Sequence, residues 1–170
     1  MSEALLRTEP ISAAPFTGAD VTIGLAAPMA RYSLRARHAQ ALEDMLGPGI
    51  PCRIGSTAGD VTCLGPDEWL LCAPAGTTIA RGEGQAVSIT DVSERAVRLM
   101  VEGSRAAETL MAGCPLDLDR LAVGRGTRTL FETVEIIVLR KHDHVFAVEV
   151  WRSFAPWLRL ALEHAARQLR

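Results

Sequence analysis

The chain has 170 residues, of which 48% are apolar and 22% are charged, and its formal net charge is −2. This length and composition are typical of a globular protein with a substantial core, and the small net charge excludes the basic surface typical of nucleic-acid-binding proteins. The sequence contains no apolar run near the ~20 residues of a membrane-spanning helix and no signal peptide, so we expect a cytoplasmic protein without nucleic-acid or membrane partners.

Residues 1–20 contain prolines and small residues without periodicity, and we expect them to form a flexible amino-terminal arm. Residues 21–170 are expected to form a single α+β domain. Two strands, a helix and a hairpin follow one another twice, approximately over 21–84 and 85–170, and a further helix closes the second half. This order predicts two split β-α-β type halves with mostly antiparallel strands and helices packed on them, as in the folate-binding domain of aminomethyltransferases.

In the first half, alternating residues predict strands at 21–25 and 31–35, and apolar residues at helical spacing predict a helix over 36–46. Strand-like segments at 61–64 and 69–73 flank a tight turn. The first half is therefore predicted to contain one strand pair, one helix and one β-hairpin.

The turn of that hairpin has the sequence Gly65-Pro66-Asp67-Glu68 and is followed by Trp69. Proline fixes the φ angle that the second position of a tight turn requires, and aspartate suits the third position. Tryptophan is common both in protein cores and at protein interfaces, and the sequence alone leaves both roles open. We single out Trp69, beside the charged turn, as the tryptophan to watch for partner contact.

In the second half, residues 86–92 and 95–102 are predicted to form the next strand pair. The alternation in 95–102 places Arg98 on a face that we expect to be solvated, opposite an apolar face. A helix is predicted to follow, with Ser104 as its N-cap and Gly113 at its end.

The segment 114–128 shows no periodicity and is expected to be irregular. Strands at 134–139 and 145–151 are predicted to form a second hairpin. The last helix has the strongest single pattern of the chain, because apolar residues recur at helical spacing over 154–169, and Ser153 is expected to cap it.

Three short segments have residue types that can carry chemistry, and in each case a structural role is favoured. His142-Asp143-His144 has metal-type side chains, but turn polarity explains them and no third ligand is identifiable. Gly124-Arg125-Gly126 is followed by strand-like sequence and lacks the helix that a phosphate loop needs. Ser93 is expected in a turn with Asp91, because no histidine is placed by the sequence to activate a serine nucleophile.

Cysteines and loop arginines also receive structural roles. The cysteines lack the spacing of a zinc site and are expected to stay reduced and mostly buried: Cys52, Cys63, Cys72 and Cys114. Three arginines are expected to be solvated, with an anionic partner surface as the alternative: Arg120, Arg125 and Arg128.

Four segments of the chain resemble the γ-subunit family of heterotetrameric sarcosine oxidase, in the order in which that family has them. They are Leu64–Leu71, Asp91-Val92-Ser93 with Val101–Ser104, Gly113–Leu118 and Arg152–Ala155. The family is a distant relative of the aminomethyltransferase, or glycine-cleavage T-protein, fold. Its Asp-x-Ser and Gly-x-x-Ala pattern is similar to Asp91, Ser93, Gly103 and Ala106.

This resemblance implies a subunit of a complex that oxidatively demethylates sarcosine to glycine, with tetrahydrofolate as the one-carbon acceptor. It implies that FAD, FMN, NAD and tetrahydrofolate are bound by partner subunits, and that the α, β and δ subunits are the partners, chiefly α. We therefore expect a non-catalytic γ subunit that supports assembly, without catalytic, cofactor-binding or metal-binding residues of its own. The acidic pair and the asparagine of the folate enzymes correspond here to Val134-Glu135 and Trp151-Arg152.

Two other functions stay open at this point. One is a folate-binding aminomethyltransferase-like protein, which Asp91-Val92-Ser93 favours, and the other is a structural subunit of another amine-oxidising complex. The family motifs also give the residues that we expect at a partner interface. These are Gly65, Pro66, Asp67, Glu68, Trp69, Asp91, Ser93, Arg152, Ser153 and Phe154.

Overall fold

The computed structural model describes residues 8–169, in which the chain forms eleven strands, three α-helices and one 3-10 helix. The first part contains β1 (Phe16–Gly18), β2 (Val21–Leu25), β3 (Met29–Ala36), α1 (Ala39–Leu46), β4 (Thr57–Ala58), β5 (Val61–Gly65), β6 (Glu68–Pro74) and β7 (Val87–Asp91). The second part contains β8 (Ala96–Glu102), α2 (Ala106–Met111), η1 (Leu118–Arg120), β9 (Gly126–Phe131), β10 (Val134–His142), β11 (Val145–Trp151) and α3 (Ala155–Gln168).

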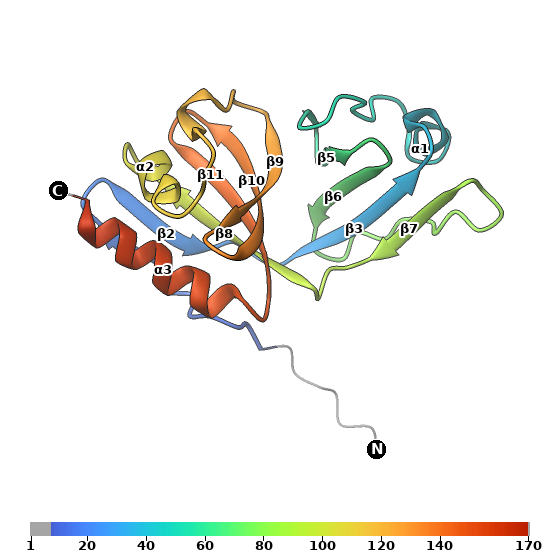
Figure 1. The fold of residues 1–170 in the computed structure, drawn as a ribbon. Helices are drawn as coiled ribbons and strands as arrows, with labels where there is room; N and C mark the ends of the chain where they lie inside the picture. The colour runs from blue at the N-terminus through green and yellow to red at the C-terminus, as the bar shows by residue number, and fades with distance from the viewer. Residues whose placement is uncertain (1–7, 170) are drawn as a thin grey trace, which may run out of the picture.

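The strands form two β-sheets (Figure 1). The first sheet has six strands in the order β1-β2-β8-β11-β10-β9, and helices α2 and α3 lie on its outer side. The second sheet has five strands in the order β4-β5-β6-β3-β7, with α1 at its outer end. All strand pairings within the two sheets are antiparallel, so the predicted α+β class with mostly antiparallel strands is confirmed.

Each sheet has its own hydrophobic core on the face that its helices cover. In the first sheet, every second residue of β8 and β11 points to α2 and α3, so that Leu99 and Phe146 pack with Leu158. In the second sheet, Leu34 and Trp69 pack in the same way with α1. Because a strand alternates its side chains, the remaining residues of these strands point to the other sheet.

The two sheets do not coincide with the two halves expected from the order of elements. β2 pairs with β8 in the first sheet, whereas β3 pairs with β6 and β7 in the second. The predicted strand pairs β2–β3 and β7–β8 are therefore wrong, and a boundary between residues 84 and 85 does not separate the sheets. The chain crosses from one sheet to the other at both places where a strand pair was expected.

Two strands lie where irregular structure was expected. β1 falls within 1–20 and pairs with β2, while β9 falls partly within 114–128 and pairs with β10. Both are strands at the edge of the sheet, and their pairing depends on a neighbour rather than on a strong alternation of their own. The side chain of Arg159 on α3 also donates to the carbonyl oxygens of Ser12 and Ala14, which attaches the residues just before β1 to the helix. Residues 1–7 of the expected arm lie outside the described residues.

The predicted helices are present, but two of their N-caps differ. The N-cap of α2 is Arg105 rather than Ser104, and the N-cap of α3 is Phe154 rather than Ser153. Neither helix has a side-chain cap hydrogen bond. Instead, a turn precedes each helix, and packing of the apolar face positions the first residues.

The corner between β8 and α2 can be formed only with glycine at position 103. Its φ angle is +126°, and a Cβ atom at this position would lie 2.1 Å from the carbonyl oxygen of Asp20. That same oxygen accepts a hydrogen bond from the backbone N–H of Arg105 at 3.2 Å. The β1–β2 turn can therefore lie against the start of α2 only when residue 103 has no side chain.

We predict that Gly103→Ala lowers the free energy of unfolding by about 3 kcal/mol, because the methyl group overlaps a backbone oxygen and the φ angle is strained. Gly84→Ala is the matched control, since Gly84 has a φ of +78° with no atom near its Cβ position. The control should lose only about 1 kcal/mol in the same urea denaturation experiment. Equal losses in the two variants would contradict the steric explanation.

Candidate functional site

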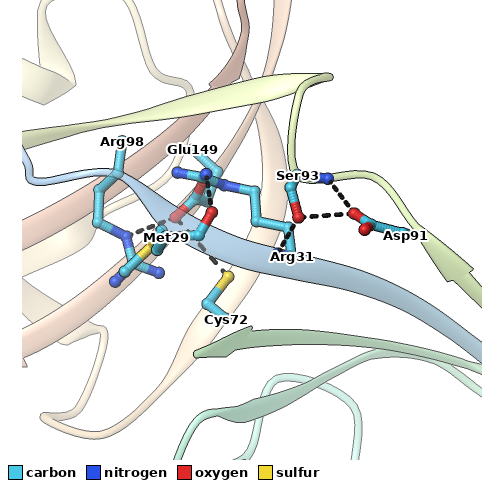
Figure 2. Close-up of polar contacts among 7 residues, drawn as sticks. All are labelled: Met29, Arg31, Cys72, Asp91, Ser93, Arg98 and Glu149. Carbon is cyan, nitrogen blue, oxygen red and sulfur yellow. Dashed lines mark hydrogen bonds and ion pairs between the residues drawn. The ribbon is translucent and has the colours of Figure 1, made fainter. Parts of the chain in front are cut away.

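The charged residues with the strongest mutual contacts lie between the two sheets. Arg31 comes from β3 in the second sheet, while Arg98 and Glu149 come from β8 and β11 in the first. All three point away from the helices, because they alternate with the apolar residues that fill the two cores. Figure 2 shows Glu149 between the two arginines.

Glu149 accepts one hydrogen bond on each carboxylate oxygen. Arg31 donates from Nε to Glu149 Oε2 at 2.7 Å, and Arg98 donates from its Nε to Oε1. Arg31 also donates to the carbonyl oxygen of Met29 at 3.2 Å. The side chains of Arg31 and Glu149 are 3% and 2% exposed, so this ion cluster is shielded from water.

The burial of Arg98 corrects the prediction of a solvated face on its strand. Its side chain is only 11% exposed, because the second sheet covers this face of the first. A strand with one apolar and one charged face is typical of a sheet with one side in water. Here the charges of one sheet instead pair across the interface with those of the other.

Cys72 on β6 lies next to this cluster, with its Sγ 3.9 Å from Glu149 Oε1. Burial, and secondarily the negative charge of Glu149, raises the pKa of the Cys72 thiol to about 12. A thiol with this pKa is protonated near neutral pH and is a poor nucleophile. Since both oxygens of Glu149 are also engaged, the cluster is suited to holding the sheets together rather than to acid–base chemistry.

A small cavity adjoins the cluster between the sheets. Its volume is about 90 Å³, and its lining includes Arg31, Glu68, Arg128, Glu149 and Trp151. Sites for cofactors and drug-sized ligands occupy about 300–1,000 Å³, so this space is too small for a folate or a flavin. It is large enough for a few water molecules.

A second ion pair joins the sheets at the turn between β5 and β6. Arg128 on β9 donates two hydrogen bonds to the Glu68 carboxylate, at 2.6 and 3.0 Å, and Arg35 lies 3.3 Å from the same group. The hydrogen bond from Arg128 lowers the pKa of the Glu68 carboxyl below its usual value. The predicted hairpin is confirmed, and Arg128 pairs within the chain instead of lying free in a solvated loop.

Asp91 and Ser93 form the turn that carries the chain from β7 in one sheet to β8 in the other. Asp91 Oδ1 accepts from the hydroxyl of Ser93 at 2.6 Å and from its backbone N–H at 2.9 Å. These bonds lower the pKa of the Asp91 carboxyl. Ser93 Oγ in turn accepts from the backbone N–H of Arg31 at 3.0 Å, so the turn is attached to β3 beside the ion cluster (Figure 2). The sequence correctly predicted a turn here.

The tryptophan of the first motif lies inside the protein. Trp69 is 2% exposed, and its indole N–H donates to the carbonyl oxygen of Pro51 at 2.6 Å. The expectation that Trp69 contacts a partner is therefore corrected, because α1 and the second sheet already cover its ring. By contrast, Trp151, Phe154 and Trp157 are about half exposed, with exposed fractions of 42%, 45% and 39%.

The closing motif forms the corner between β11 and α3. Arg152 pairs with Glu9 at 3.5 Å and with Glu94 at 3.9 Å, and its backbone N–H donates to the carbonyl oxygen of Arg95. Ser153 makes no cap bond, and Phe154 starts the helix with its ring exposed. This corner connects the amino-terminal stretch, the β7–β8 connection and α3.

The two remaining candidate segments, 142–144 and 124–126, lie at the ends of strands. His142 ends β10, and residues 143–144 form the turn to β11. Residues 124–126 lead into β9, where Gly126 donates to the carbonyl oxygen of Gly55 at 3.0 Å. Within residues 8–169, no group of three or more His, Cys, Asp or Glu side chains could hold a metal ion, and no helix is long and apolar enough to span a membrane. All four cysteines are free, and only Cys52 is exposed.

Known proteins resemble this chain over most of its length. The model of the family described as "Sarcosine oxidase, gamma subunit family" matches residues 30–168. The chain belongs to the sarcosine oxidase γ-subunit family. Among its curated members, the γ subunit from Arthrobacter sp. is 35% identical over 66% of this chain and 61% of its own, and that from Corynebacterium sp. (strain U-96) is 32% identical over 67% and 62%. The alignment thus spans about three fifths of the length of these relatives.

Solved structures also resemble this chain. A chain of the heterotetrameric sarcosine oxidase from Corynebacterium sp. U-96, in complex with pyrrole 2-carboxylate, superimposes with a TM-score of 0.80 and 26% identity over 96% of both chains. The glycine cleavage system aminomethyltransferase T from Bartonella henselae superimposes with a TM-score of 0.66 over 89% of this chain and 50% of that one. At 17% identity this second likeness shows the fold alone, and it confirms the predicted aminomethyltransferase-like fold.

We predict that Glu149→Gln lowers the free energy of unfolding by about 3–5 kcal/mol, because it leaves two buried guanidinium groups without a counter-charge. Glu135→Gln is the matched control on the neighbouring strand, since the Glu135 side chain is 49% exposed and lies 3.7 Å from Arg128. The control should change stability by less than about 0.5 kcal/mol in the same denaturation experiment. A Glu149→Gln chain as stable as wild type would contradict the role assigned to the cluster.

We also predict that Glu68→Gln removes about 1 kcal/mol of stability at pH 7. Because the folded-state pKa of Glu68 lies below the unfolded value of 4.5, its contribution is present above that value and is lost as the pH falls through the folded pKa. The difference in melting temperature between variant and wild type should therefore shrink below pH 4.5. Glu83→Gln, in the exposed loop after β6, is the control and should behave as wild type at every pH. A difference that persists unchanged in acid would refute the assignment.

Proposed function

We propose that this chain is the γ subunit of a heterotetrameric sarcosine oxidase, a complex that oxidatively demethylates sarcosine to glycine with tetrahydrofolate as the one-carbon acceptor. The observation that carries the proposal is the superposition on a chain of such a complex over 96% of both chains. A match from end to end is expected of corresponding subunits, whereas a shared domain alone would leave part of one chain unmatched. The family membership supports the same assignment.

Within that complex the chain has a structural role, and catalysis belongs to the partner subunits. The buried carboxylate Glu149 is engaged by two arginines, the Cys72 thiol is protonated near neutral pH, and Ser93 is held in a turn. These contacts explain the notable polar groups of the chain without a substrate. FAD, FMN, NAD and tetrahydrofolate are then bound by the α, β and δ subunits, chiefly the larger ones, in a cytoplasmic complex.

Folate binding by this chain itself receives no support from the residues that favoured it in the sequence. Asp91 and Ser93 bond to each other and to β3. Glu135, at the place of the acidic pair of the folate enzymes, lies 3.7 Å from Arg128 on the neighbouring strand. These contacts favour the structural role over a folate enzyme.

The proposal is tested by co-expression of a tagged form of this chain with the α, β and δ subunits of a heterotetrameric sarcosine oxidase. We expect one complex that contains all four subunits, forms hydrogen peroxide when sarcosine is added, and shows flavin absorbance that the isolated chain lacks. A tagged chain that purifies alone under these conditions would overturn the proposal. Activity with another N-methyl amine but not with sarcosine would assign the chain to a different amine-oxidising complex.

Isothermal titration calorimetry with tetrahydrofolate on the isolated chain separates the structural role from the folate-binding alternative. We expect no heat of binding, because the groups that would meet the folate are engaged within the protein. Saturable binding of one equivalent would instead favour an aminomethyltransferase-like protein.

A further inference from the structure

The outward face of α3 carries more apolar residues than a solvent-exposed helix usually does. Its apolar residues are unusually accessible: Phe154 is 45% exposed, Trp157 39% and Leu160 66%. The face continues at helical spacing with His164 and Gln168, and Arg167, whose side chain is 57% exposed, lies at its edge beside Leu160. Arg159 and Arg167 pair with Glu163, so these charges are directed toward one another along one side of the apolar face. An apolar stripe of this kind on a surface helix normally packs against another element.

A groove runs beside this face. It has a volume of about 480 Å³ and lies between α3, the end of α2 and the turn from β9 to β10. Its apolar wall includes Phe131, Trp157, Leu160 and Ala161. The rings of Phe131 and Trp157 meet edge to face, with centroids 6.3 Å apart and planes at 71°, which holds the Trp157 ring in place at the groove. We call this surface the α3 groove.

Glu132 lies at the rim of the α3 groove in a backbone conformation that disfavours glutamate. It is the first of the two residues that connect β9 to β10, and its φ angle is +51°. Glycine is the favoured residue at a positive φ in a two-residue hairpin turn. The Glu132 backbone N–H donates to the carbonyl oxygen of Gly113 at 2.7 Å, but its carboxylate has no hydrogen bond or ion pair with the described residues. The chain thus places an unpaired carboxylate where glycine would be less strained.

We infer that the α3 groove docks an apolar segment of a larger subunit of the complex, and that a lysine or arginine on this segment pairs with Glu132. This inference rests on the proposed function and adds the surface and the chemistry of the contact. Tryptophan is among the residue types that most often contribute a large share of the binding free energy at protein interfaces. The single negative charge at the rim is complementary to a cation and selects a partner that carries one.

A second copy of this chain is a poorer occupant of the groove. A symmetric dimer brings the same patch of each copy into one interface, so two Glu132 carboxylates would share it. The described groove residues offer no lysine or arginine to neutralise them, and His164 is the only other titratable side chain in the lining. Charge complementarity therefore favours a different chain with a basic residue.

The test uses three variants of the full chain, each purified in complex with the α, β and δ subunits. Leu160→Asp places a charge on the apolar wall, Glu132→Gly removes the carboxylate and relieves the strained φ angle, and Ile54→Asp is a control at a side chain that is 53% exposed in the loop before β4. Mass photometry on serial dilution of each complex gives its dissociation constant. Thermal unfolding of each free chain shows whether the substitution affects folding.

We expect Leu160→Asp to weaken the complex about 30-fold or more, and Ile54→Asp to leave it unchanged. Glu132→Gly should weaken it about 10-fold at ~0.1 M salt, and much less at ~1 M salt, where charges are screened within about 3 Å. The free Glu132→Gly chain should unfold at the same temperature as wild type or higher. Loss of association without loss of folding is the signature of a docking residue.

Three outcomes overturn the inference. Complexes of Leu160→Asp and Glu132→Gly that are as tight as wild type exclude the groove, and so does an equal loss in the Ile54→Asp control. Self-association of the free wild-type chain that Leu160→Asp abolishes, with the large subunits still bound, would assign the groove to a second copy. A wild-type chain that does not bind the large subunits at all refutes the proposed function instead, so the two failures are distinguishable.

Discussion

The two sheets depend on one buried interaction, the Glu149 carboxylate held between Arg31 and Arg98. Each sheet buries its apolar face under its own helices, so the inner faces must meet without a large hydrophobic core of their own. Burial of three charged groups is costly unless each is paired, and here both oxygens of the single carboxylate are used. Such pairing has strict geometric requirements, which fix how the sheets lie against each other.

Several of the segments in which the sequence resembles the family are corners where the chain passes between these sheets or changes direction. The turn at Asp91 and Ser93 carries the chain across beside the ion cluster. Glu68 reaches from one sheet to Arg128 on the other, and Gly103 permits two turns to touch. The charged and polar residues at these positions therefore have a structural role in holding the two sheets and their turns in place.

The exposed surface of α3 differs from the interior between the sheets. The charged groups of the interior are paired with each other, whereas α3 presents aromatic and aliphatic side chains to the surroundings. Exposed apolar side chains also occur elsewhere, for example at Ile54 and Trp151, but Phe154, Trp157 and Leu160 gather them along one helix. This arrangement is consistent with the proposed place of the chain in a complex. The fold is shared with an aminomethyltransferase, and in this chain Asp91 and Ser93 bond to each other.

The sequence by itself determined the local elements and the family. Alternation and helical spacing depend on neighbouring residues, so the hairpins β5–β6 and β10–β11 and the last helix could be predicted, as could the turn at Asp91 and the aminomethyltransferase-like fold. The tertiary structure decided which strands share a sheet, and with them the burial of Arg98 and the position of the edge strand β9. The physical reason is that a two-residue period shows that a strand has two faces but not what covers each one. Arg31 and Glu149 are 118 positions apart, and only the packing of two sheets brings them within hydrogen-bond distance.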